Sequence, residues 1–356
     1  MHGSWMAVVG LLLVVSTARG ADPYGGIDPY WMLLHEPAVI AELKLSEPQR
    51  KAYRSALDGL DLQFFPLRNK SQKEGTAGLD KIMAAAREQL GKLLSREQAG
   101  RIQEILTFKL GSAAFRRDDF AARLKLSDKQ RGDIEKILDE VQASVTAIEK
   151  EAASGKPREP LEKKFNELRT DEQKRILALL TPAQRTAWKD ALGRPFDLAK
   201  LGQPLLKAPE LIDSGEWINA KVPQQLGQQR GKVVVIHFYA AGCINCIHNY
   251  PTYREWQEKW KGSEVVLLGI HTPETSAERD LASVRQKAAA EKFAFPVLID
   301  AQSANWNAWG NSMWPSVYVV DKQGYLRNFW PGELKWQGAT GDEFIAKRVE
   351  ALLGEK

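Results

Sequence analysis

Cys243 and Cys246 are the two residues whose type and spacing could support chemistry. They are the only cysteines among 356 residues, and they lie in the stretch KVVVIHFYAAGCINCIHNYPTYREW, residues 232–256. A thiolate attacks a disulfide, and a second thiol one helical turn further on can attack the mixed disulfide and release the product. The spacing therefore predicts thiol–disulfide exchange, with Cys243 as the nucleophile and Cys246 as the resolving thiol.

Other roles of a cysteine pair fit this sequence less well. A structural disulfide would close a loop too short to remove much chain entropy. A zinc site would need more ligands than Cys243, Cys246 and His248, and a c-type haem would need a histidine where Ile247 stands. A thiol peroxidase would frame its cysteine with Thr and Pro, whereas residues 240–242 are AAG. We expect no metal and no cofactor other than a redox-active Cys243–Cys246 disulfide.

The elements around the thiols are predicted from their residue patterns. Residues 233–239, VVVIHFY, form an apolar, β-branched run typical of a central strand covered on both faces. A helix follows over residues 243–260, so that Cys243 faces unpaired N–H groups and the positive end of the helix dipole. Further strands are expected at 265–270, 295–299, 317–320 and 325–329, and further helices at 275–290, 303–309 and 342–353. This alternation predicts an α/β domain with a mixed sheet.

Several ordered motifs accompany the thiol pair: CINCI itself, His271-Thr272-Pro273-Glu274, Pro251 in the helix, and Trp314-Pro315 before a late strand. With these motifs the region from about residue 208 resembles exported thioredoxin-like domains of the TlpA/ResA/DipZ type. The resemblance implies that Pro315 is cis and lies against the thiols. It also implies that Trp314 and Pro315 line the groove that takes an extended substrate.

Two positions depart from thioredoxin itself. Thioredoxin has a buried acid in the strand before the active turn, where this chain has His237, and a Trp before the first cysteine, where it has Gly242. His237 and His271 are the candidates for proton handling. A buried core histidine is an equally good interpretation of His237, and His271 could simply cap a turn.

The N-terminus predicts export. Residues 5–15, WMAVVGLLLVV, have the length of a signal-peptide core, and Ala18 and Gly20 fit cleavage after residue 20. The alternative is an uncleaved anchor. Hydrophobic residues make up 44% and charged residues 27%, and the net charge of +5 is spread along the chain, so we expect globular protein without nucleic-acid binding. A periplasmic or other extracytoplasmic location follows from this reading.

The N-terminal half is predicted to be helical and duplicated. Residues 21–42 are interpreted as a linker with a short apolar segment, and residues 43–204 as a helical domain. The pattern L-[ST]-x-x-Q occurs four times, at Leu45, Leu94, Leu126 and Leu180, and each copy is typical of a capping box at a helix start. This repeat resembles Spy/CpxP-like periplasmic chaperone and stress-sensor proteins, which would imply a domain that binds unfolded or partner protein.

The combined prediction is an α + α/β chain: an all-helical domain followed by a thioredoxin-like domain over residues 205–356. Its predicted activity is thiol–disulfide exchange on protein or peptide disulfides. The residues do not set the direction of electron flow; the resemblance implies reduction, which would need an upstream electron donor. The alternative is a periplasmic chaperone-like or binding protein in which the thioredoxin-like domain serves for docking.

Overall fold

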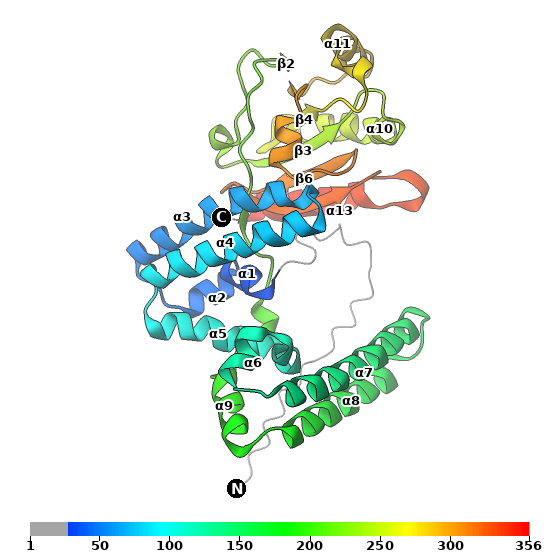
Figure 1. The fold of residues 1–356 in the computed structure, drawn as a ribbon. Coiled ribbons are helices and arrows are strands. Elements are labelled where there is room, and N and C mark those ends of the chain that lie inside the picture. The colour runs from blue at the N-terminus through cyan, green and yellow to red at the C-terminus, as the bar shows by residue number, and fades with distance from the viewer. Residues whose placement is uncertain (1–27, 356) are drawn as a thin grey trace. The chain divides into compact units, whose positions relative to one another are not determined.

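The computed structural model describes residues 28–355 (Figure 1). These residues divide into two compact units, one that joins residues 28–99 with residues 200–355 and one that comprises residues 100–199. The predicted signal peptide, residues 1–20, lies outside the described residues. Within residues 28–355, no helix combines the length and the apolarity that a membrane crossing requires.

A seven-stranded sheet forms the centre of the first unit, in the order β1-β7-β6-β3-β4-β5-β2. The central strand β3 runs parallel to β4 and antiparallel to β6, so the sheet is mixed and the predicted fold class is confirmed. The two-residue edge strands β1 and β2 were not predicted. The strands are β1 (Leu206–Lys207), β2 (Trp217–Ile218), β3 (Val233–Tyr239), β4 (Val265–His271), β5 (Val297–Ile299), β6 (Ser316–Val320) and β7 (Tyr325–Pro331).

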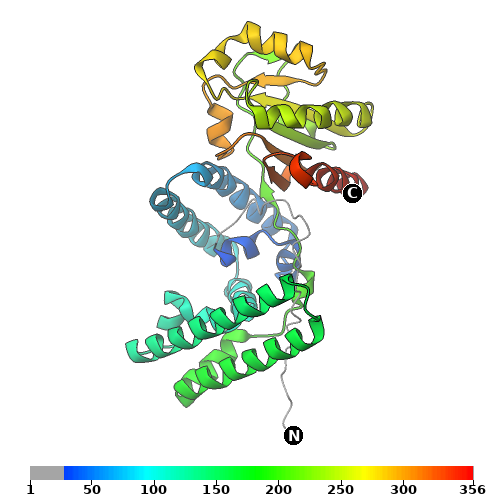
Figure 2. The ribbon, with the colours of Figure 1, turned by 90° about the vertical axis from the view of Figure 1, so that its right-hand side faces the viewer.

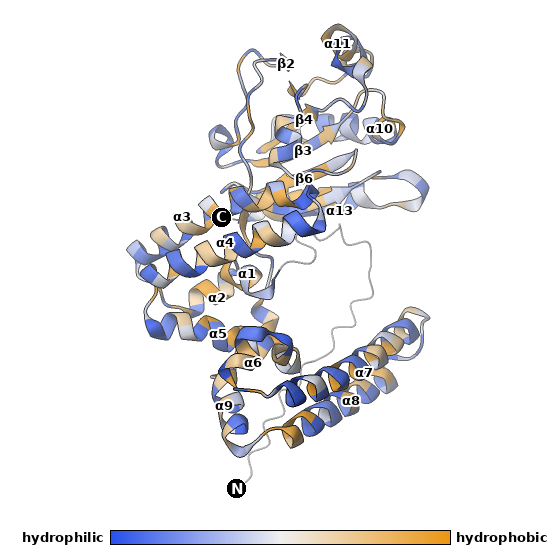
Figure 3. Ribbon diagram, in the orientation of Figure 1, coloured by the Kyte–Doolittle hydropathy of each residue, from blue (hydrophilic) through white to orange (hydrophobic). Residues whose placement is uncertain are grey.

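One face of the sheet packs against three helices, α10 (Ile244–Lys259), α11 (Leu281–Ala290) and α13 (Gly341–Gly354). Side chains of β3 and of these helices form one buried cluster, which also contains both cysteines. The strands β3 and β6 are strongly hydrophobic, as expected for a covered sheet (Figure 3). The predicted helix over residues 275–290 is two elements, η5 (Ser276–Arg279) and α11, because Asp280 caps a new helix by accepting from the Ser283 amide at 3.1 Å.

The N-terminal helices cover the other face of the same sheet. The turn η1 (Phe65–Asn69) follows α3 (Glu47–Phe64). The ring of Phe65 is fully buried, and its centroid lies 6.4 Å from that of Trp309. The Trp309 ring in turn lies 5.8 Å from the ring of Phe238 in β3. Arg68 donates to the Trp309 carbonyl at 3.1 Å and to the Tyr318 hydroxyl at 3.3 Å. The compact units therefore do not coincide with the predicted boundary at residue 204, because the sheet takes apolar and hydrogen-bonding partners from α3 and η1.

A buried histidine–aspartate pair joins these helices to the sheet edge. Within the segment interpreted as a linker with a short apolar stretch, residues 28–42 hold two short helices, α1 (Pro29–Leu34) and α2 (Pro37–Glu42). His35 follows α1, and its Nδ1 lies 2.8 Å from the Trp31 carbonyl while its Nε2 lies 2.8 Å from Asp61 Oδ1. The other Asp61 oxygen accepts from the Lys207 amide of β1 at 2.7 Å. His35 and Asp61 are fully buried, so their polar atoms need protein partners in place of water, and the Trp31 carbonyl and the Lys207 amide supply two of them.

Each L-[ST]-x-x-Q motif forms the predicted capping box, in which the hydroxyl and the glutamine side chain bond to each other's backbone N–H. The glutamines also meet in pairs, which sequence reasoning missed. Gln49 donates to Gln98 at 3.2 Å, and Gln130 donates to Gln184 at 2.8 Å. The first pair lies in the sheet-containing unit and the second pair in residues 100–199. In each copy of the duplicated sequence, the glutamine pair therefore links the N-termini of two helices of that copy.

The duplicated sequence is a duplicated structure. Lys44 and Lys125, which hold the same place in the two LKLS motifs, both take a positive φ, 49° and 52°. Each is followed by a long helix, a second long helix and a shorter one. In the second unit the two long helices lie side by side with a buried apolar seam (Figure 2).

The remaining helices are α4 (Gln72–Leu93), α5 (Arg96–Leu110), η2 (Gly111–Arg116), α6 (Asp118–Arg123), α7 (Asp128–Ala153), α8 (Arg158–Leu179), α9 (Pro182–Leu192), η3 (Leu198–Lys200), η4 (Leu226–Gln229), α12 (Ala304–Ala308) and η6 (Trp336–Gly338).

Candidate active site

The thiol pair lies where β3 ends and α10 begins, at the place that the sequence predicted. Cys243 is the N-cap residue of α10, and Cys246 lies in its first turn. Both thiols are free; Cys243 is 8% exposed and Cys246 is fully buried. A disulfide that approaches the protein therefore meets Cys243 first, while Cys246 lies behind it in the apolar cluster.

The surroundings of the two thiols move their pKa values apart. A hydrogen bond from the Cys246 thiol lowers the pKa of Cys243, and the backbone N–H groups of Cys246 and Asn245 add to this, against the effect of burial. The pKa of Cys246 is raised, because its thiol donates to Cys243 and because burial disfavours the anion. One sulfur thus favours the thiolate and the other retains its proton, which is the division of roles that exchange chemistry requires.

Trp314 and Pro315, the residues predicted to line the groove, directly precede β6, which pairs with β3. The Trp314–Pro315 peptide bond is cis. Because Ser316 pairs with Phe238 in the antiparallel β3–β6 ladder, Pro315 runs alongside the segment that leads into Cys243. The Trp314 ring stacks on Trp306 at 4.0 Å, and its Nε1 donates to the Thr272 carbonyl at 3.1 Å. The Trp314 side chain is thereby held on two sides while it packs against the cluster that contains the cysteines.

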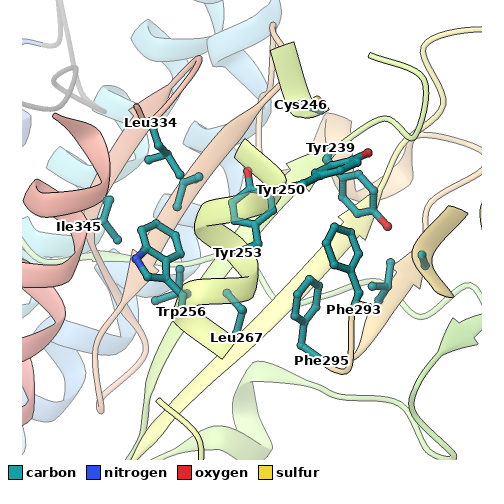
Figure 4. Close-up of a cluster of buried hydrophobic side chains, with 14 of the residues drawn as sticks. Tyr239, Cys246, Tyr250, Tyr253, Trp256, Leu267, Phe293, Phe295, Leu334 and Ile345 are labelled. Carbon is teal, nitrogen blue, oxygen red and sulfur yellow. The ribbon is translucent and has the colours of Figure 1, made fainter. Parts of the chain in front are cut away.

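His237 lies in an aromatic box and away from the thiols. Its ring stacks on Tyr253 at 4.0 Å and lies 5.0 Å from Phe295. Neither ring nitrogen has a hydrogen-bond partner among the described residues. Burial lowers the pKa of His237 to about 3. Cys246, Tyr250, Tyr253 and Trp256 follow one another along α10 (Figure 4), and seven residues at ~1.5 Å each place Tyr253 about 10 Å along the helix from Cys246.

His271 lies closer to the active turn. It ends β4 opposite Tyr239, and the two rings meet edge to face at 5.5 Å. Its side chain is buried, and burial lowers the pKa of His271 to about 4 although the negative charge of Glu278 opposes this. His271 is therefore neutral near neutral pH. The two predicted proton-handling candidates thus occupy different surroundings, and of the two His271 is the one that senses a charge of the active-site loop.

For Glu278, the sequence pattern predicted only a capping box with Thr275. That capping box is present. In addition, the Glu278 carboxylate accepts a hydrogen bond from the backbone N–H of Gly242, the residue directly before Cys243. Hydrogen bonds from the Gly242, Thr275 and Glu274 amides lower the pKa of Glu278 against the opposing effect of burial. No sequence pattern links residue 278 to residue 242, and only the fold brings them together.

Exposed apolar side chains occur on the segments that carry the thiols and the cis peptide. Six large hydrophobic side chains are strongly exposed in residues 28–355, and three of them belong to segments next to the thiols: Ile244 at 62%, Met313 at 45% and Trp336 at 48%. Ile244 follows Cys243, Met313 precedes the cis peptide, and Trp336 stacks on His248 of α10 at 3.8 Å.

Within the described part of the chain, no three His, Cys, Asp or Glu side chains are arranged to hold a metal ion.

Comparisons with known proteins match the region that contains this site. The AhpC/TSA family model matches residues 211–329. Protein DipZ of Mycobacterium tuberculosis is 35% identical over 128 residues, which are 35% of this chain and 18% of DipZ. The C-terminal part of this chain is a thioredoxin-like domain of the TlpA/ResA/DipZ type. The thioredoxin-like domain is also similar to the thiol-disulfide oxidoreductase YkuV of Bacillus subtilis, 29% identical over 158 residues, 44% of this chain and 98% of YkuV.

The same domain recurs in longer proteins. The protein SUPPRESSOR OF QUENCHING 1, chloroplastic, of Arabidopsis thaliana is 29% identical over 122 residues, 34% of this chain and 12% of its own length. This chain likewise spans less than a fifth of DipZ, 18% of its length. The similarity to these longer proteins is thus confined to the thioredoxin-like domain, and the resemblance of the helical repeat to Spy/CpxP-like proteins stays a prediction.

Proposed function

We propose that the protein is a thiol–disulfide oxidoreductase that reduces protein or peptide disulfides through Cys243 and Cys246. The observation that supports this most directly is the arrangement of the two sulfurs. The thiol at the helix start has its pKa lowered and is the more exposed, and its partner is buried with a raised pKa. The relative named a thiol-disulfide oxidoreductase, which this chain matches over 98% of its length, adds to this.

The proposed reaction passes two electrons to the substrate. The Cys243 thiolate attacks one sulfur of the substrate disulfide, an S–S bond to Cys243 forms, and the second substrate sulfur leaves as a thiolate. The Cys246 thiol then gives up its proton to a departing thiolate and attacks Cys243, which releases the first substrate sulfur. The substrate ends as one thiol and one thiolate, which takes its proton from water, and the protein ends with a Cys243–Cys246 disulfide, without any cofactor. An upstream dithiol donor must reduce that disulfide before the next turnover.

We propose Trp314 and Pro315 as the groove residues and an extracytoplasmic location for the reaction. The location is supported by the apolar run and small residues at the N-terminus. The duplicated helices are proposed to bind a partner or substrate protein. Of the two copies, the one within residues 28–99 belongs to the same unit as the exchange chemistry, and the other belongs to residues 100–199.

Insulin reduction with a small dithiol as electron source tests the activity. Cys243→Ser should abolish it, whereas Cys246→Ser should still form a mixed disulfide with substrate that mass spectrometry detects. Unchanged insulin reduction by Cys243→Ser would disprove the proposal. Hydroperoxide consumption is measured in parallel, because the matching family model has the AhpC/TSA description; peroxide turnover faster than insulin reduction would replace disulfide exchange as the function.

Two further measurements decide what the sequence left open. A reduction potential near about −270 mV, as in thioredoxin, supports a reductase, and one near about −120 mV, as in DsbA, reverses the direction. For the chaperone alternative, prevention of aggregation is measured with the full-length Cys243→Ser/Cys246→Ser variant. Full holdase activity in this variant, together with no insulin reduction by the wild type, would favour a chaperone in which the thioredoxin-like domain only docks.

A further inference from the structure

The loop after β4 contacts the active site at three points. The Thr272 amide donates to the Tyr239 carbonyl at the end of β3 at 3.0 Å. The Thr272 carbonyl accepts from the Trp314 indole at 3.1 Å, which joins the loop to the cis-proline side of the groove. Glu278 then accepts from the Gly242 amide, which joins the same loop to the turn before the nucleophile. The loop thus bridges the two sides of the site that must keep a fixed spacing.

The Glu278 bridge requires a carboxylate. One carboxylate oxygen accepts from Gly242, and the other accepts from the Glu274 and Thr275 amides at 2.8 Å each. Both oxygens therefore act as acceptors. A glutamine side chain has one acceptor oxygen and one donor NH₂ group, so it can satisfy only one of the two sides. The backbone N–H of Gly242 has no place in the ladder of β3 or in α10, and a partner for such a group lowers the cost of the turn.

Gly242 is the matching half of this contact. A Cβ added at residue 242 would lie 3.1 Å from the nearer Glu278 oxygen, a tight contact that would push the carboxylate back by a few tenths of an ångström. The position where thioredoxin has a tryptophan is thus occupied here by a residue whose bare backbone lets the carboxylate approach. The contact between Gly242 and Glu278 thus accounts both for the glycine at residue 242, where thioredoxin has a tryptophan, and for the acid at residue 278.

We propose that Glu278 is a positioning residue that fixes the Gly242 turn, and with it Cys243 at the helix start, relative to the Trp314–Pro315 side of the groove. This inference rests on the proposed function. Glu278 acts through the backbone and does not touch the reacting sulfur. If the bridge is lost, the fraction of time that Cys243 spends at the helix N-terminus falls, and the rate of attack on a disulfide falls with it.

The sign of the Cys243 pKa change separates positioning from simple charge. Removing a nearby negative charge would by itself lower the pKa of a thiol. Loss of the N-cap position instead withdraws the Cys243 sulfur from the helix N–H groups and raises its pKa. Glu278→Gln should therefore raise the Cys243 pKa. Glu274→Gln is the matched control in the same loop: the Glu274 charge raises the pKa of Cys243, so that its removal should lower it.

The experiment measures the Cys243 pKa from thiolate absorbance, and the rate of insulin reduction, in the full chain. Glu278→Gln should raise the pKa and slow the reaction on the order of tenfold, the effect of losing one charge-assisted hydrogen bond. Gly242→Ala should act alike from the other side. In a Glu278→Ala background it should add little, since interacting residues are not additive.

A folded Glu278→Gln protein whose Cys243 pKa is unchanged or lowered overturns the inference, as does full additivity of Gly242→Ala and Glu278→Ala. Gly242→Ala keeps the test open if Glu278→Gln fails to fold, because it leaves the loop sequence intact. A wild-type protein that does not reduce insulin overturns the proposed function instead, and the pKa comparison of the variants still decides the role of Glu278.

Discussion

Replacement of His237 by phenylalanine tests whether this residue is a core aromatic or a proton carrier. The structure favours the core: the ring is fully buried, stacks on Tyr253, and lacks hydrogen-bond partners among the described residues. A phenylalanine fits the same aromatic surroundings and has no nitrogen to desolvate. We therefore expect His237→Phe to fold at least as stably as the wild type at neutral pH and to reduce disulfides at the wild-type rate.

The effect on stability has a predictable pH dependence. Burial lowers the pKa of His237 from 6.5 to about 3, so that between these values the unfolded chain binds a proton that the folded chain does not. Stability therefore falls as the pH falls through that window, and the loss from His237 alone amounts to about 2 kcal/mol between about pH 8 and about pH 5. His237→Phe removes this loss, so its advantage over the wild type should grow by about 2 kcal/mol over the same interval.

Urea unfolding of the reduced proteins, followed by near-ultraviolet circular dichroism at both pH values, measures this difference. Hydrogen exchange of the β3 amides assigns it to the sheet-containing unit. Because His271 is present in both proteins, its own contribution cancels. Equal pH dependence of the two proteins would show that His237 is not held neutral. A slower release of the mixed disulfide in His237→Phe would show instead that the imidazole serves the resolving step.

Two other substitutions test how the N-terminal helices are joined to the sheet. Asp61→Ala leaves Nε2 of the buried His35 and the Lys207 amide without a partner, and should cost about 3–5 kcal/mol in a urea titration. Asp61→Asn can keep both contacts and should cost less than about 1.5 kcal/mol. Equal losses in the two variants would refute the hydrogen-bond argument. Gly310→Ala should lower the free energy of unfolding by more than about 2 kcal/mol, because φ is 61° and the new Cβ would overlap the Phe65 carbonyl oxygen. Gly332→Ala is the control: its φ is 85° but the space around it is open, so it should cost about 1 kcal/mol. Similar melting temperatures of the two variants would count against the docked position of η1.

The sequence predicted the elements whose pattern is local. The apolar run of β3, the capping-box signals and the Cys-x-x-Cys pair each lie within a few residues, and the structure has them where the patterns indicated. Two-residue strands such as β1 contain no period to detect. The contact of Glu278 with Gly242 joins residues 36 positions apart, and that of Arg68 with Trp309 joins residues 241 apart. Neither side chain differs in type from an ordinary surface charge, so no local pattern could have shown its partner.

The pairing of residues 28–99 with residues 200–355 has a consequence for the order of events during synthesis. Phe65 and Arg68 leave the ribosome long before β6 and β7 exist, and their partners follow some 240 residues later. Contacts of such sequence separation form late, since the loop between them must be closed first. Residues 114–191 form a buried apolar cluster from one continuous stretch, which can assemble while the chain grows. The sheet-containing unit, in contrast, needs β6 and β7 before Arg68 can meet Tyr318 and Phe329, so the contacts of η1 wait until the chain beyond residue 316 has been made.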